Sequence, residues 1–173
     1  MTVAVLVLLA VTAGAGLLLT ARGERLRPLW GAVALAALLS VAAALAWFAH
    51  PAVLGVAQGA TFAAFVAAIT GGGPVATAIL TAADPAAVGI AGGPQDPEIL
   101  RGGAWIGAME RAAIAGSLLV GWPEGLAVVL AVKGLGRYAE LRAPAAAERF
   151  IVGTLASGLW AVACVGVVLL LRS

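Results

Sequence analysis

The chain has 173 residues, of which 63% are hydrophobic and only 10% are charged, and its mean hydropathy is +1.10. A soluble domain of this length is nearer half apolar and a quarter charged, because a small globule cannot hide most of its residues from water. The composition therefore excludes a soluble globular protein and predicts an integral membrane protein. The net charge of +2 is too small to indicate binding of nucleic acid.

The apolar runs predict an all-α membrane bundle of about six transmembrane helices in a single domain, residues 1–173. The first run is long enough to cross a hydrocarbon core of about 30 Å. No Lys or Arg precedes it, so we expect a permanent helix and not a cleaved secretory signal. Charged residues and Pro or Gly clusters separate the later runs, and the fifth run is the shortest. The predicted spans are residues 2–20, 29–49, 52–70, 103–121, 125–138 and 150–171.

Residues 71–102 differ in character from the apolar runs. They begin with Gly-Gly-Gly-Pro at 71–74, which is typical of a turn and a helix stop, and further Gly, Pro and Asp residues follow. We therefore expect a cytoplasmic connection, in which residues 75–83 form a short helix at the membrane surface.

The distribution of basic residues predicts the orientation. With six spans and both termini outside, every Lys and Arg except Arg172 falls on or beside a cytoplasmic connection. Cytoplasmic connections carry an excess of Lys and Arg. We therefore expect a multi-pass protein of a bacterial plasma membrane with both termini outside.

A row of small residues on the third predicted helix is a candidate packing seam. Gly55, Gly59 and Ala63 recur every four residues on one helical face. Small residues at this spacing allow close approach of helix backbones in lipid, where van der Waals contact is a main source of attraction. The seam would lie within the chain or between chains, as in a homo-oligomer or a larger membrane complex.

The fourth to sixth predicted helices contain a candidate polar cluster. Folding the fourth and fifth helices into a hairpin about Pro123 brings Lys133 and Arg137 within about one helical turn of Glu110. A lone charge in a membrane costs a few kcal/mol, so we expect Glu110 to pair with Lys133 or Arg137. The whole cluster comprises Glu110, Arg111, Lys133, Arg137, Glu148 and Arg149.

Two interpretations of this cluster remain open. In the simpler one, the charges pair with one another, extend to water at the helix ends and hold three helices together. In the other, they form a polar pocket at the cytoplasmic interface that suits an anionic lipid phosphate or an anionic substrate. The sequence favours the structural interpretation.

Three strings in the last 70 residues carry a resemblance: RGGAWIGAMER at 101–111, GWPEGLAVVLAVKGLGRYAELR at 121–142 and ERFIVGTLASGLWA at 148–161. They resemble the C-terminal half of small, uncharacterised multi-pass membrane proteins of actinobacteria. The resemblance implies a bacterial inner membrane and a recurring charged cluster, but it implies no activity.

Motifs of catalysis are missing from the sequence. His50 has no Cys, Asp or Glu at ligand spacing, so we expect no metal site. There is no Gly-x-Ser-x-Gly elbow and no Walker-type loop. We therefore expect no cofactor and no enzyme activity. The favoured function is a structural or accessory subunit or scaffold, and the alternative is a small transporter or lipid-handling protein that uses the charged cluster. A membrane enzyme acting on lipid headgroups is a distant third.

Overall fold

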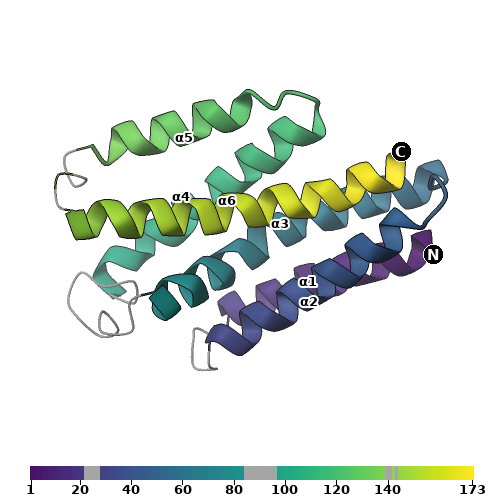
Figure 1. The fold of residues 1–173 in the computed structure, drawn as a ribbon, viewed down its shortest axis with the longest axis horizontal. Helices are drawn as coiled ribbons and strands as arrows, with labels where there is room; N and C mark the ends of the chain where they lie inside the picture. The colour runs from purple at the N-terminus through teal and green to yellow at the C-terminus, as the bar shows by residue number, and fades with distance from the viewer. Residues whose placement is uncertain (22–27, 84–96, 139–141, 143) are drawn as a thin grey trace.

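The computed structural model describes residues 1–21, 28–83, 97–138, 142 and 144–173 (Figure 1). Within this part of the chain all regular structure is helical, which confirms the predicted all-α class. The helices are, in chain order, α1 (Thr2–Ala21), α2 (Pro28–Trp47), α3 (Leu54–Ala83), α4 (Pro97–Leu119), α5 (Gly125–Gly136) and α6 (Pro144–Arg172).

Successive helices run in opposite directions. The backbone N–H of Ala52, just before α3, donates to the carbonyl of Leu171 near the end of α6 at 3.2 Å. Both chain termini therefore lie at one end of the bundle (Figure 1). We call this the terminal end. The opposite end carries the last residue of α1, Ala21, and the first residue of α6, Pro144.

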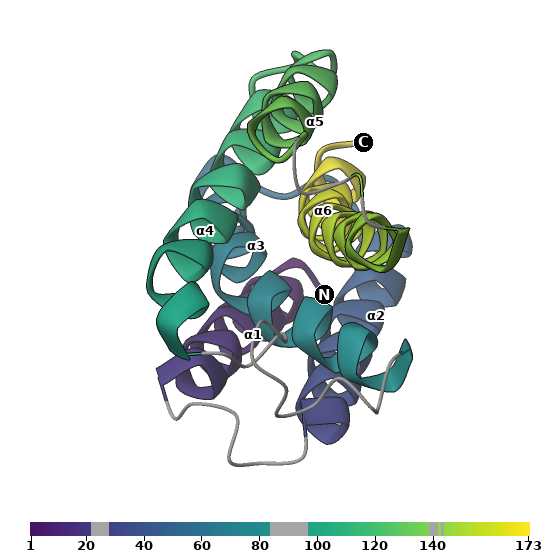
Figure 2. The same cartoon turned by 90° about the vertical axis from the view of Figure 1, so that its left-hand side faces the viewer.

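Four helices of the described part are long and apolar enough to cross a membrane, namely α1, α2, α3 and α6. The other two helices form a hairpin. In it, α4 packs against α3 and α6, whereas α5 packs against α4 on the outside of the bundle (Figure 2). With 12 residues, α5 is about 18 Å long and is shorter than a hydrocarbon core of about 30 Å. The expectation that residues 125–138 form a full span is therefore wrong, because the helix is too short.

The predicted helix stop after residue 70 is also wrong, because α3 continues to Ala83 with Pro74 inside it. Proline removes one backbone donor and tends to kink a helix, and α3 changes direction along its length (Figures 1 and 2). Proline and glycine are tolerated within membrane helices where neighbouring helices satisfy the backbone groups that they free. The predicted connection of residues 71–102 is correspondingly shorter: residues 71–83 belong to α3, 97–102 belong to α4, and 84–96 lie outside the described residues.

The small-residue seam on α3 starts later than expected. Gly55 is exposed and a Cβ there would meet nothing within 4 Å, so this residue is not part of an interface within the chain. A Cβ at Gly59 would lie 3.4 Å from Leu6 of α1, and Ala63 is buried. The seam then continues toward the middle of α3 and lies beside a second buried row. The two rows are Ala63, Ala67 and Gly71, and Ala60, Ala64, Ala68 and Gly72.

Glycine is required where α1 crosses α3. A Cβ on Gly16 would lie 2.8 Å from the backbone nitrogen of Gly71, which is closer than real Cβ contacts. Beside this crossing, the hydroxyl of Thr70 donates to the carbonyl of Ala13 at 3.0 Å. Backbone contact and an interhelical hydrogen bond therefore fix the register of α1 against the middle of α3.

Candidate functional site

The predicted ion pair of Glu110 is present, and its partner is Lys133. The ammonium group of Lys133 contacts the Oε2 atom of Glu110 and joins α5 to α4. Their side chains are 21% and 14% exposed, so the pair is largely withdrawn from the surface. The Lys133 Nζ atom also lies 5.8 Å from the centre of the Phe150 ring on α6, within cation–π range. This ion pair therefore connects three helices, as the structural interpretation predicts.

Arg111, the next residue along α4, points away from this pair. Adjacent residues of an α-helix differ by about 100° in direction. As a result Arg111 enters the bundle between α3 and α6 and is only 7% exposed. The structure thus separates the predicted cluster into two parts. Glu110 and Lys133 form an ion pair with no net charge on one face of α4, and the guanidinium of Arg111 is buried on another face.

The guanidinium of Arg111 is anchored to two helices. Its Nε–H donates to the carbonyl of Ile69 on α3 at 2.8 Å. Its Nη1 donates to the hydroxyl of Ser157 on α6 at 3.1 Å. Both acceptors are neutral, so they orient the guanidinium without cancelling its charge.

Three glycines make room for the Arg111 side chain. A Cβ on Gly72 would collide with its Cδ atom, and a Cβ on Gly107 would lie 3.1 Å from its Nη1. A Cβ on Gly73 would lie 3.7 Å from Nη2, an ordinary contact distance. Gly72 and Gly73 of the Gly-Gly-Gly-Pro segment that suggested a turn therefore form part of the wall against which Arg111 packs.

Trp160 of α6 closes the site on one side. Its indole Nε1–H donates to the carbonyl of Ala67 at 3.0 Å, and its ring lies so close to α3 that a Cβ on Gly71 would be 2.6 Å from it. The side chain is 6% exposed. This tryptophan is therefore packed between helices, unlike Trp30, Trp47, Trp105 and Trp122, which are all more than half exposed.

The charge of Arg111 has no carboxylate partner within salt-bridge distance among the described residues. The nearest acidic residue along the helix, Glu110, is paired with Lys133. Over the same part of the chain, the Nη2 atom of Arg111 has no hydrogen-bond partner. A buried arginine with an unused amino group that carries two donors can accept an anion as its partner.

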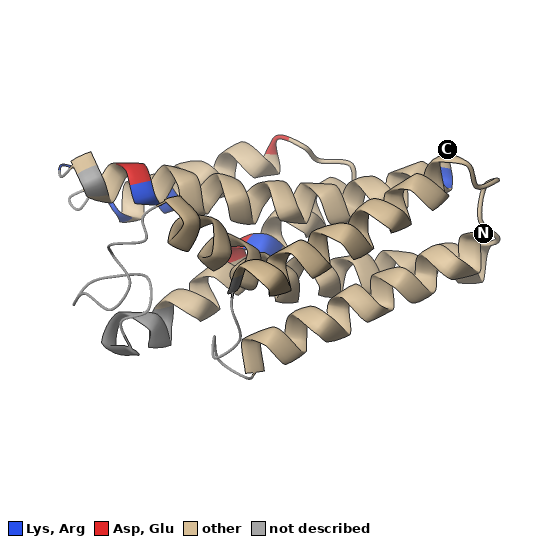
Figure 3. Ribbon diagram, turned by 60° about the horizontal axis from the view of Figure 1, so that its bottom comes forward, with Lys and Arg blue, Asp and Glu red and all other residues tan. Residues whose placement is uncertain are grey.

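The remaining members of the predicted cluster lie away from Arg111. Glu148 and Arg137 are exposed, Arg149 is half-buried, and both arginines have interacting partners. Charged residues gather near the end of the bundle opposite the termini (Figure 3). Arg172, the last residue of α6, lies at the terminal end. The described residues contain no group of His, Cys, Asp or Glu that could hold a metal ion.

No protein-family model matches the chain, and no curated protein or solved structure is significantly similar to it. A functional argument must therefore start from the chain's own residues. The sequence grouped Arg111 with Glu110 because the two are adjacent. The signal that separates them is the position of Gly107, four residues before Arg111 on the same helical face.

Proposed function

We propose that this protein is a multi-pass membrane protein that binds an oxyanion at Arg111, either the phosphate of a lipid or an anionic solute. The observation that supports this function is the buried guanidinium, which has two neutral acceptors, an Nη2 atom without a partner and no carboxylate within salt-bridge distance in the described part of the chain. An ionisable residue inside a membrane bundle usually marks a substrate site or a proton relay.

The depth of Arg111 fits such a site. Ser157, which accepts a hydrogen bond from Arg111, precedes Arg172 by 15 residues, so it lies about 22 Å along α6 from the terminal end. Gly16 contacts Gly71 beside the Arg111 site and follows Thr2 by 14 residues, which is about 21 Å along α1 from the same end. In a core of about 30 Å that begins at the terminal end, the guanidinium lies within the last third, close to the opposite headgroups. With both termini outside, these are the headgroups of the cytoplasmic leaflet.

The geometry of arginine favours an oxyanion as ligand. The guanidinium is planar and always charged, and its donors match the oxygens of phosphate and carboxylate groups. The Nη2 atom faces the side of α3 where Gly73 has no side chain, beside Thr20 near the end of α1. This side of the guanidinium is the one from which an anion would approach.

The experiment measures the thermal unfolding of the purified protein in two arms. In the first, inorganic phosphate is titrated against chloride at constant ionic strength. In the second, the protein is placed in nanodiscs of phosphatidylglycerol or phosphatidylcholine. A ligand that binds only the folded state raises the unfolding temperature. We expect a rise with phosphate if the ligand is a solute, or with phosphatidylglycerol if it is a lipid.

Two matched alanine variants separate binding from folding. In Gly73→Ala the new methyl group lies at contact distance from Nη2. We therefore expect the basal unfolding temperature to remain, the response to phosphate to disappear and the response to phosphatidylglycerol to decrease. In Gly166→Ala, where a Cβ meets nothing within 4 Å, we expect both to remain. Absence of any anion response in the wild type, or an unchanged response in Gly73→Ala, would overturn the proposal in favour of the accessory role.

A further inference from the structure

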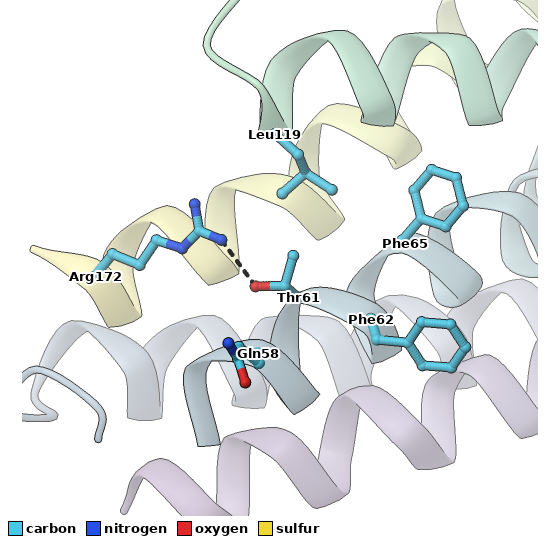
Figure 4. Close-up of a pocket in the computed structure, with 6 residues that line it drawn as sticks. All are labelled: Gln58, Thr61, Phe62, Phe65, Leu119 and Arg172. Atoms are coloured by element: carbon cyan, nitrogen blue, oxygen red, sulfur yellow. Dashed lines mark hydrogen bonds between the residues drawn. The ribbon is translucent and has the colours of Figure 1, made fainter. Parts of the chain in front are cut away.

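A groove at the terminal end of the bundle is separate from the Arg111 site. It has a volume of about 320 Å³ and is open to the surroundings. Its walls come from three helices that are distant in sequence (Figure 4). The lining residues are Gln58, Thr61, Phe62 and Phe65 of α3, Leu119 of α4 and Arg172 of α6.

The groove exists because the α4–α5 hairpin is shorter than its neighbours. The hairpin turn stops short of the end at which both termini lie (Figure 1). Beyond Leu119, α3 and α6 continue to Leu54 and Arg172, and no further helix of the described part of the chain covers them on this side (Figure 1). Phe62 at the edge of this space is 71% exposed, so in a membrane its ring would face lipid.

The two ends of the groove differ in polarity. Arg172 and Gln58 lie on one side, and the rings of Phe62 and Phe65 lie on the other (Figure 4). The guanidinium of Arg172 is held by a hydrogen bond of 3.0 Å from its Nη2 to the hydroxyl of Thr61. Thr61 accepts this bond and donates its own hydroxyl hydrogen to the carbonyl of Ala57 at 2.7 Å. One amino group of Arg172 is thus fixed, which orients the rest of the guanidinium at the mouth of the groove.

We infer that this groove binds one anionic phospholipid from the leaflet at the terminal end. The polar side of the groove is nearer the helix ends, at headgroup level, and the aromatic side is nearer the bilayer core. A phospholipid has the same polar-to-apolar order. Its phosphate would contact Arg172, and an acyl chain would lie against Phe62, Phe65 and Leu119. The inference depends on insertion of the bundle in a membrane and not on anion binding at Arg111.

The test is native mass spectrometry of the delipidated protein titrated with phosphatidylglycerol or phosphatidylcholine. All variants are made in the Gly73→Ala background, so that a lipid at Arg111 does not contribute. Both lipids carry a phosphate, but the choline cation of phosphatidylcholine balances it, whereas phosphatidylglycerol has a net negative charge that attracts an arginine at headgroup level. We therefore expect the background protein to prefer phosphatidylglycerol by about tenfold.

Three substitutions locate this preference. Arg172→Gln should remove the preference for phosphatidylglycerol while a lipid is still bound, and Leu119→Trp should fill the groove and release both lipids. Arg142→Gln removes an exposed cation on the segment between α5 and α6 and should change nothing. Equal binding of the two lipids, a preference that survives in Arg172→Gln, or a lipid-free dimer would each overturn the inference. If the anion response expected at Arg111 is absent but the lipid preference at Arg172 is found, the two sites are independent.

Discussion

Arg111 donates its Nε–H to the carbonyl of Ile69 at 2.8 Å, one residue before the carbonyl that Pro74 leaves without its usual helical donor. A side chain of α4 therefore supports α3 where the backbone of α3 is weakest. This contact joins α4 to α3 just before the segment of three glycines and a proline, and it holds the guanidinium in place.

Gly16→Ala should destabilise the protein, whereas Gly14→Ala should not. A methyl group on residue 16 would meet the backbone of Gly71, which cannot rotate away, while one on residue 14 meets nothing within 4 Å. Overpacking of this kind costs about 1–3 kcal/mol. Thermal unfolding in the same detergent measures both variants, and equal stability of the two would show that α1 and α3 are not in backbone contact at this crossing.

Glu110→Gln and Lys133→Met should each lower stability, and the double variant should recover part of the combined loss. Removal of one partner leaves the other charge unpaired in a poorly hydrated place. Polar pairs within membranes have an average coupling of about 0.6 kcal/mol, so the unfolding measurements must resolve a few tenths of a kcal/mol. The control cycle combines Lys133→Met with Glu124→Gln at the start of α5, where we expect additive losses. Additivity in both cycles would contradict the ion pair.

Trp160→Phe should lower stability by about 1 kcal/mol or more, because it removes the hydrogen bond to the carbonyl of Ala67 and part of the ring that covers Gly71. Trp30→Phe is the matched control, since Trp30 is 67% exposed. We expect its unfolding temperature to be that of the wild type. If the two variants unfold alike, the indole of Trp160 does not hold α6 against α3.

Cysteines at Phe48 and Arg142 should differ in their reaction with a membrane-impermeant thiol reagent in intact cells. Both positions are exposed, and they lie at opposite ends of the bundle. In a Cys164→Ala background, the termini-out orientation predicts labelling at position 48 and protection at position 142 until the cells are permeabilised. The reverse pattern would place the Arg111 site near the outer leaflet.

Composition and hydropathy were sufficient to predict the helical class and the two N-terminal helices. Gly14 and Gly31 lie inside these two apolar runs and do not interrupt the helices. They failed at Gly71–Pro74, since breaker residues are recognised from their behaviour in water. Here Gly71 and Gly72 are buried and Gly73 and Pro74 are half-buried, so side chains of other helices replace much of the solvent. An ion pair of Glu110 with Lys133 or Arg137 was predictable because a hairpin about Pro123 fixes which residues are level, but the choice of Lys133 was not. The position of Arg111 was not, because it depends on how far α4 is rotated about its own axis.

The division of charges along α4 has a consequence for biogenesis. This helix carries Glu110 and Arg111 into the bundle, but the Lys133 that neutralises the first is on α5, and the Ser157 that binds the second is on α6. During synthesis from the N-terminus, α4 leaves the ribosome before either partner exists. We therefore expect the translocon to release α4 into lipid only after the rest of the chain has emerged, so that the last three helices are integrated together.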